Sequence, residues 1–379
     1  MRLQALKLVG IRNLVPLTIE PGQGFNVFAG DNGQGKTNLL EAIYVLCTLR
    51  SFRTSRLADL IALGAERGKI AGRVETQDLS RLFEVDLGPR GRSVRMDGKA
   101  VRPIKRYFGH FNVVLFAPED LLVVRGSPGE RRKFLDRAVW SRTQDYLTTC
   151  QDYEKTLKSR NQLLRNVQQE KTTWAKAAAV IAVYDQQLSE LGAEIMAQRL
   201  DFLDIVREPY GATFESIMRA GLRAGVGYSA KEELSEAIGS SAGERRANLQ
   251  VALLQLLESR HQLDRLRGTT SVGPHRDDLL FTLEDQPAAT FASQGQTRAM
   301  VLAWKTALLR KLFHWRGEPP VLLLDDVSSE LDPRRNEYLF DSLRELKCQC
   351  FITTTHPSYV LLDSHRTDWT VEAGRVEAT

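Results

Sequence analysis

Residues 30–37 read Gly-Asp-Asn-Gly-Gln-Gly-Lys-Thr, and this stretch decides the fold. It follows an apolar run at 25–29 that is typical of a buried strand, and it precedes a helical pattern from Asn38 to Leu49. Strand, glycine-rich loop and helix in this order match the G-x-x-x-x-G-K-[ST] pattern of a phosphate-binding P-loop. The alternative is an ordinary glycine-rich turn, which the complete motif in its complete context disfavours. The sequence therefore predicts a nucleotide site on an α/β fold.

The positions of this loop have distinct predicted roles. The glycines let successive backbone N–H groups converge on a phosphate chain, and the helix start adds the positive end of its dipole. Lys36 is predicted to reach the β- and γ-phosphates, and the Thr37 hydroxyl to hold Mg²⁺. The predicted nucleotide contacts are Gly30, Asp31, Asn32, Gly33, Gln34, Gly35, Lys36 and Thr37.

Length and composition narrow the class of protein. A chain of 379 residues exceeds the usual size of one domain, so we expect two domains or one domain with a large insertion. No apolar run of membrane-spanning length and no signal peptide is recognisable, which predicts a cytoplasmic protein with no membrane partner. The net charge of +5 permits a polyanionic partner without proving one. The scattered cysteines predict reduced thiols and no zinc site; they are Cys47, Cys150, Cys348 and Cys350.

The domain organisation follows from a change of composition near Ser127. Ser127, Pro128 and Glu130 form a helix-start pattern with a capping box. From there to about residue 267, helical spacing dominates, with a break between helices expected at 221–227. Two helices of about 35 residues, each roughly 50 Å long, would form an antiparallel arm. The predicted domains are a first head segment at 1–126, a helical insertion at 127–268 and a second head segment at 269–379.

Strand patterns lie on both sides of the insertion. Alternation or short apolar runs predict strands at 2–9, 17–19, 113–116 and 277–283, and a meander at 69–101 with a hairpin turn at 97–98. Just before the strand at 277–283, the polar run 271–278 contains a histidine, an arginine and two carboxylates. We favour a specific role for this run over a solvated loop.

The predicted second half of the site is an apolar strand that ends in two acids, Asp325 and Asp326. In P-loop proteins the acidic strand is expected beside the P-loop strand. Asp325 is predicted to be a Mg²⁺ ligand together with Thr37, and Asp326 is predicted to polarise the attacking water.

Three further elements complete the pattern. Ser293 is a natural N-cap for a helix through Leu309, whose free N–H groups suit a second phosphate contact. The segment 328–332 follows the double acid, and a strand at 350–355 ends at His356. A lone histidine at a strand end is usually structural, but five elements in this order favour a catalytic role for it.

This order resembles the ATP-binding cassette superfamily, with its Walker A, signature motif, Walker B, D-loop and switch histidine. By that resemblance the signature residues close over the ATP of a second copy, so that ATP joins a head-to-head dimer. The chain departs from the common Leu-Ser-Gly-Gly-Gln signature and has Asp326 where many cassettes have glutamate, which favours slow hydrolysis. No Q-loop glutamine is recognisable; residues 118–120 occupy the region. The signature residues are Ser293, Gln294, Gly295 and Gln296.

Within the superfamily the chain most resembles the RecF family, which is related to SMC and Rad50 heads, and the resemblance spans the whole chain. It is carried by residues 12–13, 30–38, 51–54, 116–121, 129–132, 273–278, 293–296 and 324–327. It implies an ABC-type P-loop head of α/β class, with a mixed sheet, flanking helices and an inserted all-helical arm lobe.

The resemblance also implies a function. The family is expected to bind ATP and Mg²⁺, to dimerise on ATP, and to bind gapped, single-stranded and double-stranded DNA. It acts with RecR, RecO and RecA in gap repair, replication-fork maintenance and SOS induction. Any ATPase activity is expected to be weak, DNA-stimulated and used as a switch.

Candidate DNA contacts and rival functions remain open at this point. In SMC-type heads an arginine after the Walker A helix senses phosphate and DNA, and the resemblance predicts Arg53 as its counterpart. A transporter-associated ABC ATPase would share the five motifs, but the insertion of about 140 residues disfavours it. A scaffold that holds ATP without turnover is disfavoured by Asp326. Any single basic residue is more often a solvated charge; the candidates are Arg50, Arg53, Arg56, Arg131, Arg132 and Lys133.

Overall fold

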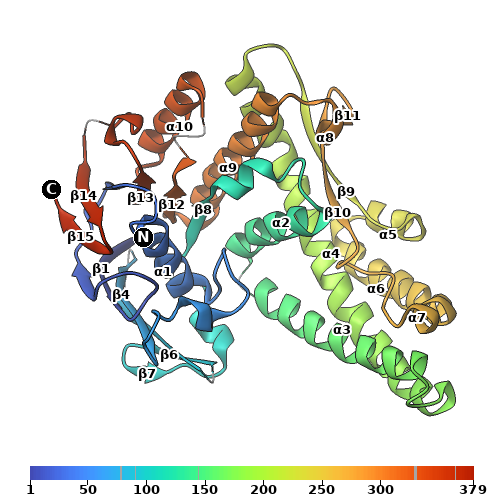
Figure 1. The fold of residues 1–379 in the computed structure, drawn as a ribbon. Helices are drawn as coiled ribbons and strands as arrows, with labels where there is room; N and C mark the ends of the chain where they lie inside the picture. Colours follow the sequence, from blue (N-terminus) through green and yellow to red (C-terminus); the bar gives the residue numbers. More distant parts are fainter. Residues whose placement is uncertain (77–78, 90, 144, 328–330, 363) are drawn as a thin grey trace. The chain divides into compact units, whose positions relative to one another are not determined.

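The structure is a computed structural model that describes residues 1–379 except 77–78, 90, 144, 328–330 and 363. The chain forms two compact units (Figure 1): Met1–Leu122 joined with Arg298–Thr379, and Val123–Thr297. The first unit therefore combines two separate stretches of sequence. These limits differ from the predicted domain boundaries at 126 and 268. Because spatial compactness alone does not define a domain, those boundaries stay a prediction.

The first unit contains a six-stranded antiparallel sheet in the order β2-β1-β4-β5-β6-β7. The predicted strands at 2–9 and 17–19 and the predicted meander are confirmed. Asp97 and Gly98 both have positive φ, 52° and 75°, as a tight hairpin turn requires. The strands are β1 (Arg2–Val9), β2 (Leu17–Ile19), β4 (Gly68–Glu75), β5 (Ser80–Gly88), β6 (Gly91–Met96) and β7 (Lys99–Ala100).

The second sheet of this unit carries the P-loop strand and has the order β15-β14-β3-β13-β12-β8. Only β14 and β15 pair antiparallel. We expected the strand of Asp325 beside the P-loop strand, and that expectation is wrong because β13 lies between β12 and β3. The strands are β3 (Phe25–Ala29), β8 (Val113–Phe116), β12 (Val321–Asp325), β13 (Cys350–Thr354), β14 (Arg366–Glu372) and β15 (Arg375–Ala378).

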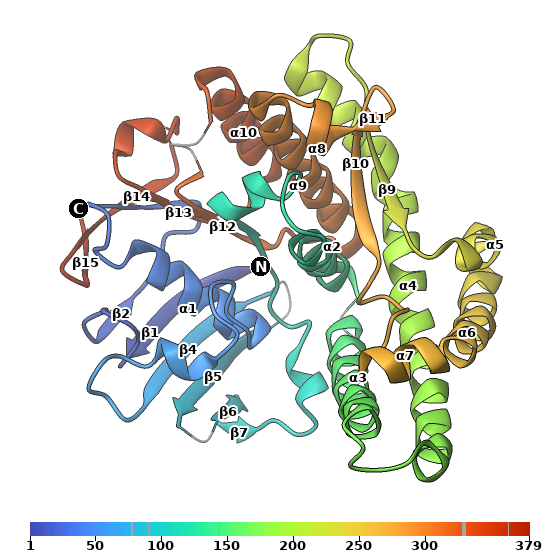
Figure 2. The same cartoon turned by 45° about the vertical axis from the view of Figure 1, so that its right-hand side comes forward.

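Helix α1 (Lys36–Thr48) contacts strands of both sheets, and Figure 2 shows it between them. Eleven of its 13 residues are buried, as expected for a helix with sheet on two sides. Two of these buried residues, Lys36 and Glu41, carry charge. The later helices of the chain are α9 (Gln294–Arg316), which begins before residue 298, and α10 (Pro333–Leu346). Short 3₁₀ helices span 57–60, 104–107, 118–122, 232–234 and 357–359.

The second unit is mostly helical. Its long helix α4 contacts α3 and α6, and α3 and α4 form an antiparallel hairpin with 23 and 45 residues instead of the expected 35 each. The predicted capping box at the start of α2 is confirmed. The helices are α2 (Pro128–Arg142), α3 (Tyr146–Gln168), α4 (Trp174–Met218), α5 (Ser235–Gly239), α6 (Ala242–Ser259), α7 (His261–Arg267) and α8 (Ala288–Phe291). Among the described residues, no helix has both the length and the apolar character needed to cross a membrane.

A small sheet interrupts the helical pattern of this unit, so the insertion is not all-helical as predicted. Its order is β11 (Gln286–Pro287), β10 (Asp278–Leu283) and β9 (Ala224–Ser229). The expected break at 221–227 is mostly strand β9. A Cβ on Gly225 would lie 2.4 Å from Thr282 Oγ1 on the paired strand. The Thr282 side chain thus occupies the space beside Gly225, whereas the space beside Gly227 is open.

Candidate nucleotide-binding site

The loop between β3 and α1 has the conformation that its glycines predict. Gly33 and Gly35 have φ of 82° and 117°, and Gly35 is the N-cap of α1 without a side-chain cap. The first N–H groups of α1 are therefore not capped by the N-cap side chain, and such a helix start suits an anion. A Cβ on Gly35 would lie 2.8 Å from Leu14 Cδ2, which explains why no larger residue stands there.

Lys36 lies along this loop. Its side chain is buried, and its Nζ donates to the carbonyl oxygens of Gly30 and Asp31 at 2.6 and 2.8 Å. Burial lowers the pKa of Lys36, whereas the charges of Asp326, Asp325 and Asp31 oppose that shift. The ammonium is thus held at the loop where phosphates are predicted to bind.

Thr37 and Asp325 meet although the P-loop strand β3 and the strand of Asp325, β12, are not neighbours. Thr37 Oγ1 donates to Asp325 Oδ1 at 2.8 Å, and Thr353 Oγ1 on β13 donates to the same oxygen at 2.8 Å. Thr37 reaches Asp325 because it belongs to α1, which also contacts β12. Burial raises the pKa of Asp325, and the hydrogen bonds from Thr37 and Thr353 partly oppose this. A hydroxyl and a carboxylate oxygen at this distance fit the hard oxygen ligands of Mg²⁺.

Asp326 and His356 follow the ends of two parallel strands. Asp326 has a φ of 47°, and its N–H donates to Thr353 Oγ1 at 2.9 Å, so the chain turns directly after Asp325. His356 follows β13, is exposed, and packs edge-on against Tyr359 with ring centroids 5.4 Å apart. Since β3, β13 and β12 run parallel, their carboxyl ends and the residues after them share one edge of the sheet. The catalytic roles stay predictions.

Glu119 occupies the region where no Q-loop glutamine was recognised. It follows β8, the parallel neighbour of β12, and is exposed. Its charge adds to the effect of burial in raising the pKa of Asp325. Its neighbour Asp120 is buried and forms an ion pair with Lys305 at 2.9 Å, which is a structural role. This edge of the sheet thus carries a further carboxylate, that of Glu119.

The predicted signature residues form the start of α9. Ser293 Oγ accepts from Gln296 N–H at 3.2 Å, and Gln296 Oε1 accepts from Ser293 N–H at 2.7 Å. This reciprocal pair is a capping box, which confirms Ser293 as an N-cap. Ser293 and Gln294 are exposed. Their contact with a nucleotide stays a prediction, and residues 328–330 of the predicted D-loop lie outside the described residues.

The predicted DNA contacts fall into two groups. Arg131 donates from Nε and Nη2 to both carboxylate oxygens of Asp278, at 2.8 and 2.6 Å, and Arg132 donates to the carbonyl oxygen of Asp277. Both side chains already have partners within the second unit. Arg53 and Arg56 are also paired, with Glu41 and Asp59 at 3.7 and 3.6 Å, but they are exposed; Lys133 is exposed too, and Arg50 is half-buried. All six stay predictions.

A chain of hydrogen bonds connects Arg53 to the P-loop. Arg53 Nη1 donates to Asn38 Oδ1 at 2.7 Å, Asn38 Nδ2 donates to Asn13 Oδ1 at 2.7 Å, and Asn13 Nδ2 donates to the Gly33 carbonyl at 3.0 Å. The buried Glu41 lies beside it and pairs with Arg12 through two bonds of 3.1 Å. The family resemblance marked residues 12–13, 30–38 and 51–54, but it gave no role to Asn13 or Asn38 and did not predict this chain of bonds.

The turn between β14 and β15 also holds the P-loop. The N–H groups of Ala373 and Gly374 donate to Gln34 Oε1 at 2.6 Å and to the Gln34 carbonyl at 3.0 Å. A Cβ on Gly30 would lie 2.2 Å from the Val371 carbonyl oxygen. Sequence reasoning missed this contact, because nothing in residues 366–378 resembles a motif.

The polar run 271–278 is not a solvated loop. Tyr153 Oη and His275 Nδ1 are 2.8 Å apart, and Tyr228 Oη donates to Asp277 Oδ2 at 2.6 Å. Burial lowers the pKa of His275 to about 4 and raises that of Asp277 to about 6. These contacts join α3, β9 and the start of β10, so the run stabilises the second unit.

Comparison with known proteins decides the family. Residues 2–370 match the model of the RecF/RecN/SMC N terminal domain. The curated "DNA replication and repair protein RecF" of Geobacter sp. (strain M21) is 40% identical over 355 residues, which cover 94% of this chain and 93% of that protein. This chain belongs to the RecF family.

Comparison with solved structures supports membership of the RecF family. The one named "Structure of the recombination mediator protein RecF-ATPrS in RecFOR pathway" has a TM-score of 0.87 at 30% identity and covers 100% of this chain and 98% of its own. A structure of the SmcHead bound to the C-winged helix domain of ScpA has a TM-score of 0.54 at 15% identity, with 100% and 97% covered. That second likeness shows the fold alone. The RecF-family resemblance and the ATPase-head fold predicted from the motifs are confirmed.

Proposed function

We propose that this RecF-family chain is an ATP-dependent DNA-binding protein of cytoplasmic DNA replication and repair. The observation that carries the proposal is the P-loop with its buried Lys36 and the 2.8 Å bond between Thr37 and Asp325. The solved relative named RecF-ATPrS and the curated relatives named as replication and repair proteins support it.

In this proposal the loop residues 30–37 and the N-terminus of α1 bind the phosphates of ATP. Lys36 exchanges its bonds with the Gly30 and Asp31 carbonyls for bonds with phosphate oxygens. Thr37 and Asp325 hold Mg²⁺, which would neutralise phosphate charge when bound. Asp326 orients the attacking water, and His356 at the same sheet edge acts on the γ-phosphate.

ATP would also control assembly. The exposed start of α9, Ser293 to Gln296, closes over the ATP of a second copy, which gives an ATP-dependent homodimer. The dimer binds gapped, single-stranded and double-stranded DNA. It acts with RecR, RecO and RecA in gap repair, replication-fork maintenance and SOS induction. The solved relatives are described as members of the RecFOR pathway, which supports RecO and RecR as partners.

Fluorescence anisotropy of labelled gapped duplex DNA tests the proposal, with ATP, with ADP and without nucleotide, at two salt concentrations. We expect tight binding with ATP that weakens steeply as salt rises, because phosphate contacts release counterions. DNA binding of the same strength with ATP, with ADP and without nucleotide would refute the proposal, and so would no DNA binding at all. Either result would favour a transporter-type ABC ATPase.

Asp326→Asn tests the hydrolysis step. It should lower ATP turnover by about 100-fold or more while ATP binding persists, because an amide does not accept a proton from the attacking water. Phosphate release and binding of a fluorescent ATP analogue measure the two effects. Asp341→Asn, at an exposed position on α10 outside the predicted motifs, is the control with the same chemical change. Equal turnover in Asp326→Asn and the unchanged protein would remove Asp326 from the mechanism and favour an ATP-holding scaffold.

A further inference from the structure

The end of the α3–α4 hairpin has a packed core of its own. Leu164, Ala177 and Ile181 are buried together, and Leu163, Val167 and Trp174 pack against them. Further along α3, the fully buried Arg160 binds Asp185 of α4 and Asp264 of α7 at 2.6 and 2.8 Å. The two helices are thus fixed to each other by side-chain packing and by a buried ionic cluster.

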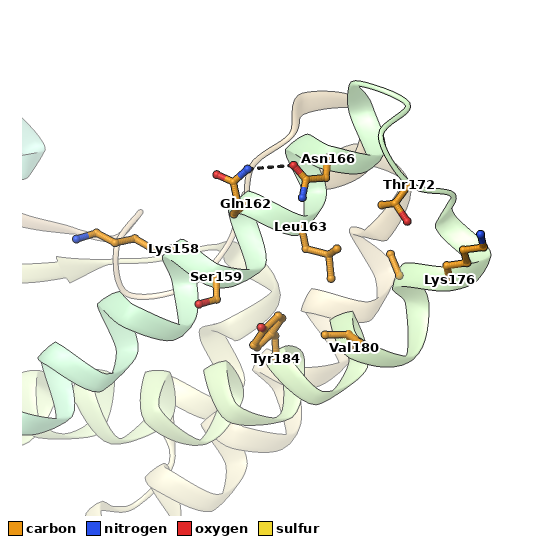
Figure 3. Close-up of a pocket in the computed structure, with 10 residues that line it drawn as sticks. Lys158, Ser159, Gln162, Leu163, Asn166, Thr172, Lys176, Val180 and Tyr184 are labelled. Atoms are coloured by element: carbon orange, nitrogen blue, oxygen red, sulfur yellow. Dashed lines mark hydrogen bonds between the residues drawn. The ribbon is translucent and has the colours of Figure 1, made fainter.

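A hollow of about 520 Å³ lies on the outside of this hairpin. Figure 3 shows Lys158 and Lys176 at its opposite ends, with Leu163 and Val180 between them. Val180 is 45% exposed although it is aliphatic. The lining residues are Lys158, Ser159, Gln162, Leu163, Asn166, Thr172, Lys176, Ala177, Val180 and Tyr184.

Positive charge concentrates around the hollow. Residues 155–176 contain a single carboxylate, Glu170, against five cations besides the buried and paired Arg160. With Arg160 included, the six cations and one carboxylate of this segment give a formal net charge of +5, the same as that of the whole chain. Within the described part of the chain, neither Lys158 nor Lys176 forms an ion pair. The five cations are Lys155, Lys158, Arg165, Lys171 and Lys176.

The chemistry of the lining favours a nucleic acid strand over an acidic peptide. The lining holds no carboxylate, and its polar groups are lysines, amides and hydroxyls, which are the side chains that contact phosphate and sugar oxygens. The ring of Tyr184 offers a face for a base, as in proteins that bind single strands. The hollow's volume of about 520 Å³ and the ring of Tyr184 suit the unpaired base of a single strand, because stacking needs a base face that a duplex does not expose.

We propose that this hollow binds single-stranded DNA, with Lys158 and Lys176 on successive stretches of backbone and Tyr184 against a base. The inference rests on the proposed DNA-binding function. It adds a contact surface on the helical unit, separate in sequence from the arginines that follow the P-loop helix.

Salt-dependent binding of a fluorescein-labelled oligothymidine to the full-length protein with ATP tests the inference. Lys158→Ala/Lys176→Ala should weaken binding and flatten the plot of log affinity against log salt by about 1.4, since each lost phosphate contact on a single strand removes about 0.7. Tyr184→Leu should weaken binding by roughly 5- to 150-fold, whereas Tyr184→Phe keeps the ring and should bind nearly as the unchanged protein.

Lys155→Ala/Lys171→Ala is the matched control. It removes two charges from the same hairpin, but neither lysine lines the hollow. The control should leave the slope close to that of the unchanged protein. Binding of a fluorescent ATP analogue and the helical circular dichroism show that each variant is folded.

The outcomes separate the inference from the function on which it rests. If the two double variants give the same slope of log affinity against log salt, the hollow is not a binding site. The total positive charge of the hairpin would then explain the salt dependence. Unaltered oligothymidine binding by Lys158→Ala/Lys176→Ala, with ATP-dependent binding of gapped DNA intact, would overturn the inference alone. If the unchanged protein with ATP binds neither the oligothymidine nor the gapped duplex, both proposals fail.

Discussion

Lys36→Ala is expected to weaken ATP binding by on the order of 100-fold and to abolish ATP-dependent dimerisation. The substitution removes charge-assisted hydrogen bonds, each worth about 1.5–3 kcal/mol. It also leaves Asp325 and Asp326 without the cation whose charge they sense, so they would repel incoming phosphates. Titration of a fluorescent ATP analogue measures the affinity, and light scattering measures the dimer.

The control for this experiment is Lys7→Ala, which removes the same side chain from an exposed position on β1. It should bind ATP normally. Thermal unfolding without nucleotide shows whether Lys36→Ala remains folded. A folded Lys36→Ala protein that binds ATP as tightly as the control would contradict the assignment of the loop.

Ser293→Arg is expected to leave ATP binding intact but to weaken the ATP-dependent dimer by at least about 30-fold, or about 2 kcal/mol. The exposed start of α9 is where the nucleotide of a second copy is proposed to approach, and a long side chain there blocks close contact. Sedimentation or light scattering with ATP measures the dimer, and the fluorescent ATP analogue measures binding in the same samples.

Because Ser293 also caps α9, a substitution there can weaken the helix as well as the proposed contact with the nucleotide of a second copy. The experiment must distinguish these two effects. Removing such a cap costs about 1 kcal/mol of stability. Ser293→Thr keeps a hydroxyl that caps the helix and adds only a methyl group, so it should dimerise almost normally. If Ser293→Arg dimerises with ATP as well as Ser293→Thr does, the signature residues do not contact a partner's nucleotide.

The features that the sequence predicts well are those with a local cause. Strands at 17–19, 25–29 and 113–116 match the structure because short apolar runs and turn residues mark both ends. The capping box of α2 and the N-cap at Ser293 each depend on residues close together in the sequence. Thr37 and Asp325 are far apart in the sequence, but the order of the motifs predicted both as ligands of the same Mg²⁺. Their contact could therefore be predicted.

The features that were missed depend on contacts between distant segments. Strand β13 lies between β12 and β3. The residue pattern of a single strand does not predict which strands pair with it. The link from Arg53 through Asn38 and Asn13 to Gly33 joins the P-loop stretch 30–38 to Asn13 and Arg53, and no pattern in the sequence connects these three segments. Strand β9 was missed because glycine has a low strand propensity, and Gly225 leaves the space that the Thr282 side chain of the paired strand occupies.

The order of strands around β3 also determines when this site can form during synthesis. Both neighbours of β3 come from residues 350–372, and Asn26 bonds to Cys350 across 324 positions of sequence. At about 5–20 residues per second, a ribosome needs roughly 15–65 s to make that interval. The P-loop strand β3 therefore leaves the ribosome early and remains unpaired until β13 and β14 have been made. Meanwhile the helical unit at 123–297 is complete in sequence and has its own core, so it can fold first. A nascent chain cannot use ATP to stabilise itself until its last strands have been translated.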